Sequence, residues 1–242
     1  MDLTIVVPAR NEEAVLGETV EAIEQNVTTP HRIIVVNDHS TDRTVQVVDE
    51  ISRKHPNIEL VHNTKEPGFA NAMVTGFENV RTELVVPVMA DRCDDPSTID
   101  EMVKEIARGY DAVCASRYIR GGRKEGGPVI QSLCSRLVCL TIHYFVRTAT
   151  RDVSNAFKLY RKSVIDSICL QSRSIELSME LALKAHFKGY RMSEVPTTWR
   201  GRTKGDSKVR LLRIAPGYIR WYVWALVQRL KRLCRAMRTP SR

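Results

Sequence analysis

The chain has 242 residues, 43% hydrophobic and 27% charged, so one domain with a complete core is expected, and disordered, collagen-like and disulfide-scaffold proteins are excluded. The formal net charge of +9 is concentrated in residues 200–242, which hold 13 Lys and Arg and a single acid, Asp206. The other 199 residues carry 24 basic and 27 acidic side chains, so the sequence predicts a nearly neutral globular domain followed by a basic arm.

The first 120 residues alternate short β-branched runs with amphipathic stretches, which predicts an α/β domain on a largely parallel sheet. The expected strands are Leu3–Val7, Ile33–Val36, Ile58–His62, Leu84–Val88 and Ala112–Ala115. The expected helices are Glu12–Gln25, a segment through Val45, Val48 and Ile51, then Ala70–Asn79 and Pro96–Arg108.

The second half begins with four glycines between positions 121 and 127, which predict a loop. The apolar stretch Pro128–Ala149 is long enough for a helix of about five to six turns. Two more strands, Ala156–Tyr160 and Arg191–Thr198, are expected on either side of a helix at Ile175–Phe187.

Six widely spaced cysteines without metal-ligand spacing indicate reduced core thiols in a reducing cytosol. The N-terminus lacks the pattern of a signal peptide. No run reaches the about 18 apolar residues of a membrane span, so no segment is predicted to cross a bilayer.

Polar residues follow four of the predicted strands, at the sheet edge where parallel α/β proteins bind ligands. They occupy the segments Pro8–Glu12, Asn37–Ser40, Ala90–Asp95 and Ser116–Tyr118. The chain has neither GxGxxG after the first strand nor GxxxxGK[ST], so nucleotide phosphates would need a metal ion. The acids at 91, 94 and 95 suit Mg²⁺ or Mn²⁺, although an acidic cap for the next helix explains the same residues.

Seven segments in order resemble the glycosyltransferases of family 2, and among them most closely the enzymes that transfer mannose or glucose to dolichyl or polyprenyl phosphate. The segments are VVPARNEE at 6–13, VVNDHSTDRT at 35–44, GFANAMVTGF at 68–77, VMADRCDDP at 88–96, ASRYIRGG at 115–122, RDVSNAFKLYRK at 151–162 and WRGRTKGDSK at 199–208. The resemblance covers about 200 residues and implies the GT-A fold, a mostly parallel central sheet flanked by helices.

The resemblance also implies a donor site at the strand ends. Its expected residues are Pro8, Asn11, Glu12, Asn37, Asp38, Gly68 and Asp91. Asp91 matches the second Asp of the family's DxD motif, which holds the metal on the donor diphosphate. The first Asp of that motif is Met89 here, so Asp94 is the expected substitute as a second metal ligand.

The acceptor phosphate is expected to meet Arg117, Ser135, Arg202 and Lys208. Arginine suits this role because its paired donors match phosphate oxygens. Asp91, Arg117 and Arg202 are the expected catalytic residues. The late acids Glu176 and Glu180 are assigned structural or loop-ordering roles, since a phosphate acceptor needs no strong general base.

The implied reaction moves a hexose with inversion from a nucleotide diphosphate sugar to a polyprenyl or dolichyl monophosphate. GDP-mannose is the favoured donor and UDP-glucose the next. Two alternatives stay open: a family 2 enzyme acting on a sugar or protein acceptor, and a non-catalytic, membrane-docked pseudo-transferase, which Met89 motivates.

The division expected along the chain is a catalytic domain over 1–210, with a nucleotide-sugar half (1–120) and an acceptor half (121–210), and an arm over 211–242. The arm is predicted to form one or two amphipathic interface helices over 211–237, beside the apolar helix from Pro128, so that the two enclose a groove for the lipid. Its apolar run argues against nucleic-acid binding, and a core or oligomer helix remains a further possibility. The predicted location is peripheral, on the cytoplasmic face of a membrane.

Overall fold

The computed structural model describes residues 1–202 and 211–238. Its main sheet has seven strands in the order β3-β2-β1-β4-β7-β5-β8, and all neighbours are parallel except β7, which is antiparallel to both β4 and β5. These strands are β1 (Leu3–Ala9), β2 (His31–Asn37), β3 (Ile58–His62), β4 (Leu84–Pro87), β5 (Ala112–Ser116), β7 (Lys158–Arg161) and β8 (Met192–Pro196).

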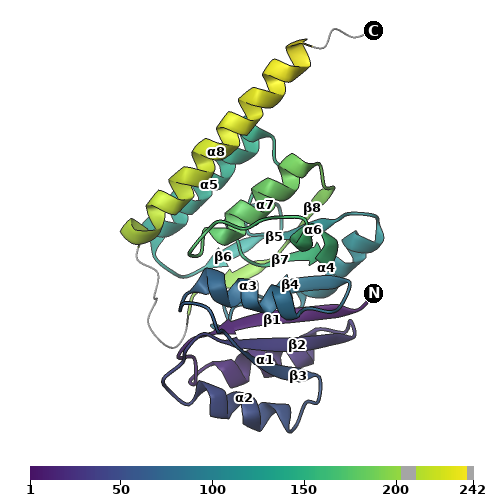
Figure 1. The fold of residues 1–242 in the computed structure, drawn as a ribbon, viewed down its shortest axis with the longest axis vertical. Coiled ribbons are helices and arrows are strands. Elements are labelled where there is room, and N and C mark those ends of the chain that lie inside the picture. Colours follow the sequence, from purple (N-terminus) through teal and green to yellow (C-terminus); the bar gives the residue numbers. More distant parts are fainter. Residues whose placement is uncertain (203–210, 239–242) are drawn as a thin grey trace.

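Helices cover both faces of the sheet (Figure 1). The larger ones are α1 (Leu16–Asn26), α2 (Thr44–Ser52), α3 (Phe69–Asn79), α4 (Thr98–Ala107), α5 (Val129–Val146), α7 (Leu177–Lys188) and α8 (Leu211–Arg238), and α6 (Lys162–Asp166) is short. Because successive side chains of a strand point to opposite faces, β1 supplies Ile5 and Val7 to one core cluster, with α1 and α4, and Val6 to the other, with α3. The predicted α/β class and mostly parallel sheet are therefore confirmed.

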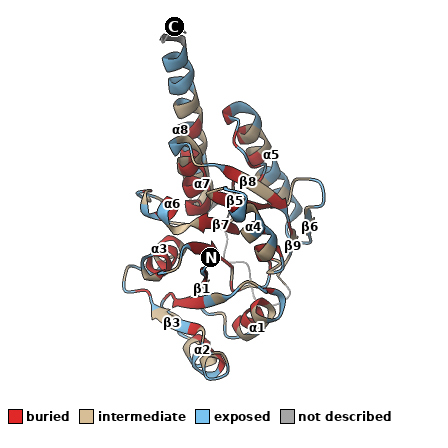
Figure 2. Cartoon of the chain, turned by 90° about the vertical axis from the view of Figure 1, so that its right-hand side faces the viewer, coloured by how far each residue is buried: buried red, intermediate tan, exposed pale blue. Residues whose placement is uncertain are grey.

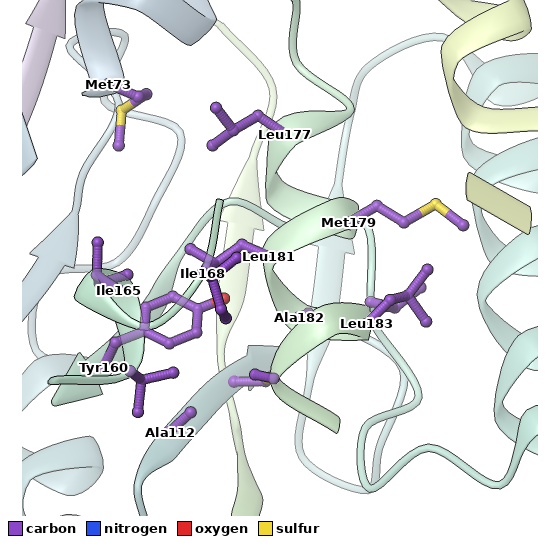
Figure 3. Packing of buried hydrophobic residues seen from close by; sticks show 14 of the residues in the cluster. Met73, Ala112, Tyr160, Ile165, Ile168, Leu177, Met179, Leu181, Ala182 and Leu183 are labelled. Atoms are coloured by element: carbon purple, nitrogen blue, oxygen red, sulfur yellow. The ribbon is translucent and has the colours of Figure 1, made fainter. Parts of the chain in front are cut away.

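The second cluster fills the space between the sheet and helices α3 and α7 (Figure 3). Tyr160 of β7, Ile165 of α6 and Leu181 of α7 belong to it, and all three are buried. This packing fixes the second half of the chain against the strands of the first half.

Three predicted boundaries are wrong for local reasons. The first helix begins at Leu16 rather than Glu12, because residues 13–15 form a turn in which the backbone carbonyl of Glu12 accepts the N–H groups of Val15 and Leu16. The glycine-rich segment contains a strand, β6 (Arg123–Glu125), paired in parallel with β9 (Thr198–Arg200). The predicted strand Arg191–Thr198 therefore divides into β8 and β9, which belong to different sheets.

The predicted C-terminal helices form a single helix, α8, in contact with α5 and α7. Trp221 is 1% exposed and its indole N–H donates to the Ser172 hydroxyl at 2.7 Å, while Ala225 is also buried. Gly217 allows the close approach, since a Cβ there would lie 2.7 Å from the Glu176 carboxyl carbon. One face of α8 is thus part of the domain core, which the sequence analysis kept only as a further possibility for the arm. The far end of α8 extends beyond the domain and is exposed (Figure 2).

The six cysteines are all free thiols. Cys93, Cys114 and Cys139 are buried, as expected of core thiols, and the other three are exposed. Within the described residues one helix, α5, has the length and apolar composition that a membrane crossing requires, contrary to the sequence-based expectation. However, its Cys139 and Ile142 are fully buried in the domain.

Candidate functional site

The loops after β1 and β2 are bound to each other at the carboxyl edge of the sheet. Asn11 adopts a left-handed backbone conformation (φ 51°), which Asn tolerates better than most residues. Its N–H donates to the Ser40 hydroxyl at 3.0 Å, and its side-chain oxygen accepts the N–H of Thr41 at 2.8 Å. The Glu12 N–H donates to the Thr44 hydroxyl at 2.9 Å, so the predicted donor residues Asn11 and Glu12 are bound to the loop after β2.

Asp38 lies at the end of β2 and is almost fully buried. Its carboxylate accepts the side-chain N–H of Asn63 at 2.8 Å and the backbone N–H of Gly68 at 3.0 and 3.1 Å. Asn37, beside it, contacts the ring of His62 at 3.1 Å and accepts the Ser40 N–H. Asp38 and Gly68, both predicted donor residues, are therefore in direct contact.

Pro8 lies in β1, whose last residue, Ala9, accepts the backbone N–H of Asp38 at 2.8 Å. This bond fixes the ends of β1 and β2 at the same level. The predicted nucleoside-binding residues thus come from adjacent strand ends, as the topology of a parallel sheet requires.

Arg202 joins two acids from distant parts of the sequence. Its Nε lies 3.0 Å from Oδ2 of Asp91, and its Nη1 lies 3.6 Å from a carboxylate oxygen of Glu12. The acids follow β4 and β1, which are neighbours in the sheet, and Arg202 follows β9. Two of the predicted catalytic residues, Asp91 and Arg202, are therefore in contact.

Asp94 lies behind Asp91 and accepts the Met89 N–H at 3.4 Å. Burial, and after it the charge of Asp91, raise the pKa of Asp94 to about 7. In the two described ranges no three His, Cys, Asp or Glu side chains gather as a metal cluster. The donor set nevertheless fits Mg²⁺ or Mn²⁺, because Mg²⁺ is commonly held by one or two carboxylates together with substrate phosphates.

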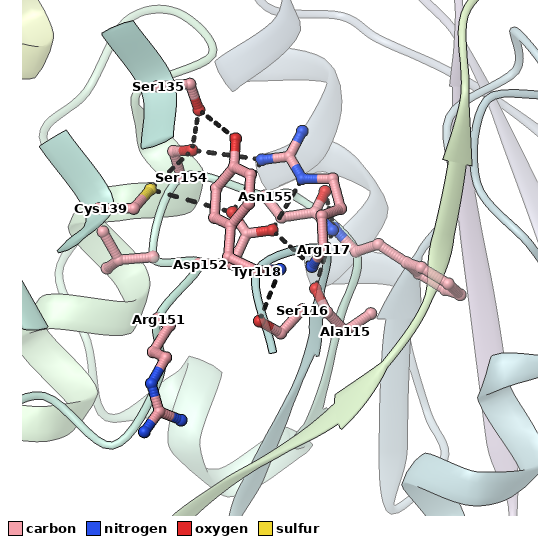
Figure 4. A network of polar contacts seen from close by, with 12 residues as sticks. Ala115, Ser116, Arg117, Tyr118, Ser135, Cys139, Arg151, Asp152, Ser154 and Asn155 are labelled. Atoms are coloured by element: carbon pink, nitrogen blue, oxygen red, sulfur yellow. Dashed lines mark hydrogen bonds and ion pairs between the residues drawn. The ribbon is translucent and has the colours of Figure 1, made fainter. Parts of the chain in front are cut away.

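The third predicted catalytic residue, Arg117, forms a paired contact with a carboxylate that the sequence analysis did not single out (Figure 4). Its Nε and Nη2 each lie 2.7 Å from an oxygen of Asp152, which is fully buried and also accepts the Arg117 backbone N–H. Burial alone would lower the pKa of Arg117, but the Asp152 charge raises it above its ordinary value. The guanidinium is therefore a permanent, rigidly oriented cation.

Hydroxyl groups extend this network toward α5 (Figure 4). Ser154 lies 3.5 Å from Nη2 of Arg117 and 3.0 Å from the hydroxyl of Ser135, to which the Tyr118 hydroxyl also donates at 3.2 Å. Arg117 and Ser135, both predicted acceptor-phosphate residues, are thus brought together through Ser154. Lys158, which is also buried, donates to the carbonyl oxygens of Val153 and Asn155, and these bonds fix the segment that carries Asp152 and Ser154.

A cavity of about 930 Å³ connects these groups to the apolar helices. Its charged lining side chains are Asp91, Arg117, Lys124 and Arg202. The lining side chains from α5 and α8 are largely apolar: Leu137, Val138, Ile214, Ala215, Tyr218, Ile219 and Tyr222. The predicted groove between the apolar helix and the C-terminal arm is therefore present, and Asp91, which follows β4, lies at its charged end.

A comparison with protein families matches residues 4–169 to the model "Glycosyl transferase family 2". The chain belongs to this family. The resemblance found in the sequence is thereby confirmed, and the matched residues of this family 2 glycosyltransferase include the loops after β1, β2, β4 and β5.

Two curated relatives have names that state an acceptor. A dolichol-phosphate mannosyltransferase of Pyrococcus furiosus is 28% identical over 87% of this chain, which spans 60% of that protein. A polyprenol monophosphomannose synthase of Mycolicibacterium smegmatis is 25% identical over 94% of this chain and 88% of its own length.

Among solved structures, glucosyl-3-phosphoglycerate synthase from Mycobacterium tuberculosis, in complex with Mn²⁺, UDP and glucosyl-3-phosphoglycerate, has a TM-score of 0.68. It is 17% identical, and the match covers 94% of this chain and 79% of that one. At this identity the likeness shows the fold, and the expected GT-A fold is confirmed.

Two further predictions for this glycosyltransferase concern acids and a lysine. Glu180 accepts the N–H groups of Gln171 and Ser172, and Glu176 accepts those of the next two residues, so both acids order the loop before α7 as expected. Lys208 lies outside the described residues. Asp152 and Ser154 were missed as site residues, although the segment RDVSNAF that carries them was one of the family motifs.

Proposed function

We propose that this family 2 glycosyltransferase transfers a hexose from a nucleotide diphosphate sugar to a polyprenyl or dolichyl monophosphate, with inversion, at a membrane surface. The observation that carries the proposal is the division of the cavity into a charged end, at Arg117 and Arg202, and an apolar remainder between α5 and α8. An isoprenoid phosphate has the same division. A free sugar acceptor would leave the apolar wall without a partner.

The names of the two curated relatives agree with this acceptor class. We favour GDP-mannose as the donor and UDP-glucose next. The nucleoside would lie against Pro8, Asn11 and Glu12, with Asp38 acting through the Gly68 backbone that it holds.

The reaction needs few groups from the protein beyond those that hold the substrates. The second pKa of a phosphate monoester is about 6, so the acceptor is largely dianionic at pH 7 and already nucleophilic. Glu176 and Glu180, to which the sequence analysis assigned structural roles, both accept backbone N–H groups of the loop before α7. Rate enhancement would then come from orienting the two substrates and from the charges of Arg117 and Arg202.

We propose that Asp91 holds Mg²⁺ or Mn²⁺, with Asp94 as the second carboxylate. Such an ion, when bound, neutralises charge on the departing diphosphate. The fold neighbour crystallised with UDP contains Mn²⁺ in one structure and Mg²⁺ in another. Because Asp91 is ion-paired with Arg202, cation binding to Asp91 would leave the guanidinium available to a phosphate.

We further propose a peripheral location on the cytoplasmic face of a membrane, with the arm 211–242 as the interface element and residues 1–210 as the catalytic part (1–120 for the nucleotide sugar, 121–210 for the acceptor). Two helices carry exposed apolar side chains that support this: Val129, Ile130, Leu133, Leu137, Tyr144 and Phe145 on α5, and Ile219, Val223, Val227, Leu230 and Leu233 on α8. Basic residues between 229 and 238 add attraction to an anionic surface.

The test is a transfer assay with purified protein, labelled GDP-mannose or UDP-glucose, and polyprenyl phosphate in vesicles, followed by lipid extraction. Label in the lipid fraction that requires Mn²⁺ or Mg²⁺ and is absent with unphosphorylated polyprenol supports the proposal. Label only on a sugar or protein acceptor would favour the first alternative. Donor binding without any transfer would favour a pseudo-transferase, the alternative that Met89 motivates.

A further inference from the structure

Among the described residues, three cationic side chains line the cavity: Arg117, Lys124 and Arg202. Two of them are held by carboxylates, Arg117 by Asp152 and Arg202 by Asp91. Lys124 forms no ion pair with any carboxylate within residues 1–202 and 211–238. Its ammonium is thus the cavity cation that the described part of the chain leaves unneutralised.

The ammonium of Lys124 is held in position by Trp199. The parallel pairing of β6 with β9 sets these two residues opposite each other, and Nζ lies 4.7 Å from the centre of the indole ring. Gly127, with φ 79°, closes over the ring, since a Cβ there would lie 3.1 Å from it. The neighbours Arg123 and Glu125 are exposed, so within this strand the Lys124 side chain alone is partly covered.

The electrostatic surroundings of Lys124 favour an anion nearby. Partial burial and then the positive charge of Arg117 lower the pKa of Lys124. An aromatic face attracts a cation but does not accept three hydrogen bonds, so the ammonium keeps donors to offer. The start of α5, represented by Pro128 and Gln131, lines the same cavity, so Lys124 shares that cavity with the helix that carries Ser135, a predicted acceptor-phosphate residue.

We propose that Lys124 binds the phosphate of the lipid acceptor, and that Trp199 is the residue that positions its ammonium. This inference rests on the proposed function. A dianionic phosphate calls for more than one cation, and Asp152 already takes the paired N–H groups of Arg117. Lys124 supplies the further charge, and the phosphate stabilises it in return.

The kinetic test compares Lys124→Met, which keeps most of the apolar stem, with Lys124→Arg, which keeps the charge. Arg123→Gln, which removes one charge from an exposed neighbour on the same strand, is the matched control. We expect Lys124→Met to raise the KM for polyprenyl phosphate about 10- to 100-fold, the range for loss of a hydrogen bond to a charged group. Lys124→Arg should restore most of that loss, Arg123→Gln should change KM less than about 2-fold, and the Kd of the nucleotide sugar should stay unchanged.

An equal loss in Lys124→Met and Arg123→Gln would overturn the proposal, as would an unchanged acceptor KM. A donor Kd that weakens as much as the acceptor KM would also overturn it, because Lys124 would then face the donor diphosphate.

A binding test separates this inference from the transfer activity. Farnesyl phosphate, farnesol and inorganic phosphate are titrated in turn while tryptophan fluorescence is recorded, with Trp199→Phe to identify the signal of that ring. We expect farnesyl phosphate to change the Trp199 signal in wild type, and Lys124→Met to weaken its binding at least about 10-fold. Farnesol should bind equally to both proteins.

If wild type transfers no sugar to polyprenyl phosphate, the proposed function fails, and this titration alone decides the role of Lys124. Equal binding of farnesyl phosphate by wild type and Lys124→Met would overturn the proposed role of Lys124. A response to inorganic phosphate as strong as that to farnesyl phosphate would identify a general phosphate site, and it would likewise overturn the assignment to a lipid acceptor.

Discussion

Removing the negative charge of Asp152, which pairs with Arg117, should destabilise the protein more than the loss of an exposed ion pair would. The side chains of Arg117 and Asp152 are 9% and 0% exposed, and two N···O distances of 2.7 Å join them. Breaking such a buried pair from one side leaves an uncompensated charge, which costs about 3–5 kcal/mol. With a urea dependence of about 3 kcal/mol per M, Asp152→Asn should lower the unfolding midpoint by about 1–1.7 M.

The double variant Arg117→Met/Asp152→Asn should be more stable than Asp152→Asn alone. It removes both charges, and the Asn amide oxygen can still accept the backbone N–H that Asp152 accepts from residue 117. We expect a remaining loss of about 1 kcal/mol, so the double variant should be about 2–4 kcal/mol more stable than Asp152→Asn alone, and a double-mutant cycle that includes Arg117→Met measures the coupling of the two side chains. Transfer should nevertheless stay low in the double variant, because the acceptor phosphate loses the Arg117 cation.

Urea unfolding followed by circular dichroism measures the four proteins of the cycle, and Glu101→Gln is the control. Glu101 pairs with Lys104 on the surface at 2.6 Å, both side chains being about 60% exposed, and such pairs are worth at most about 1 kcal/mol. If Asp152→Asn cost no more than Glu101→Gln, the Arg117–Asp152 pair would be well solvated, and the reasoning from burial would be refuted.

Three other predictions concern the metal, the arm and pH. Asp91→Ala should lower metal-dependent transfer about 100-fold or more and weaken Mn²⁺ binding in calorimetry, with Asp94→Ala the next most damaging; full activity of Asp91→Ala would contradict the assignment. Deletion of residues 229–242, which lie beyond the buried part of α8, should weaken binding to anionic vesicles at least about 100-fold in flotation assays. The Kd of the nucleotide sugar should stay unchanged, and undiminished flotation would disprove the interface role of these residues. Burial, then the charges of Arg232 and Arg229, lower the pKa of His186 to about 4, so the unfolded state binds the proton more readily and stability should fall as pH drops from about 6.5 toward 4. Urea midpoints measured across this pH range should decrease less in His186→Gln than in wild type. An equal decrease in both proteins would show that His186 does not cause the pH dependence.

The structure also changes how the C-terminal arm can be tested. From the sequence, all of residues 211–242 form an appendage whose removal leaves the donor pocket intact. Trp221 and Ala225 are buried against the domain, so a deletion from 211 would expose core surface and obscure any effect on membrane binding. A deletion after Gln228 leaves both residues in place.

The sequence by itself determined the α/β class, most strands of the parallel sheet and the edge of the sheet at which the predicted site residues gather. Those features depend on local signals: β-branched runs such as Ile33–Val36, helical spacing of apolar residues, and polar residues directly after strands. The motif segments, Asp91 among them, are likewise contiguous in the chain, so they could be recognised before any contact was known.

Only the tertiary structure decided which side chains meet. Arg117 and Asp152 are 35 residues apart, and they become partners because β5 and β7 are adjacent and antiparallel. The pairing of Lys124 with Trp199 depends on a short strand inside a glycine-rich segment, where local propensity predicts a loop. Trp221 lies in an aromatic and basic segment of the kind found at membrane interfaces, yet its side chain is buried in the core. Burial depends on the elements that surround a side chain in space and not on its neighbours in sequence.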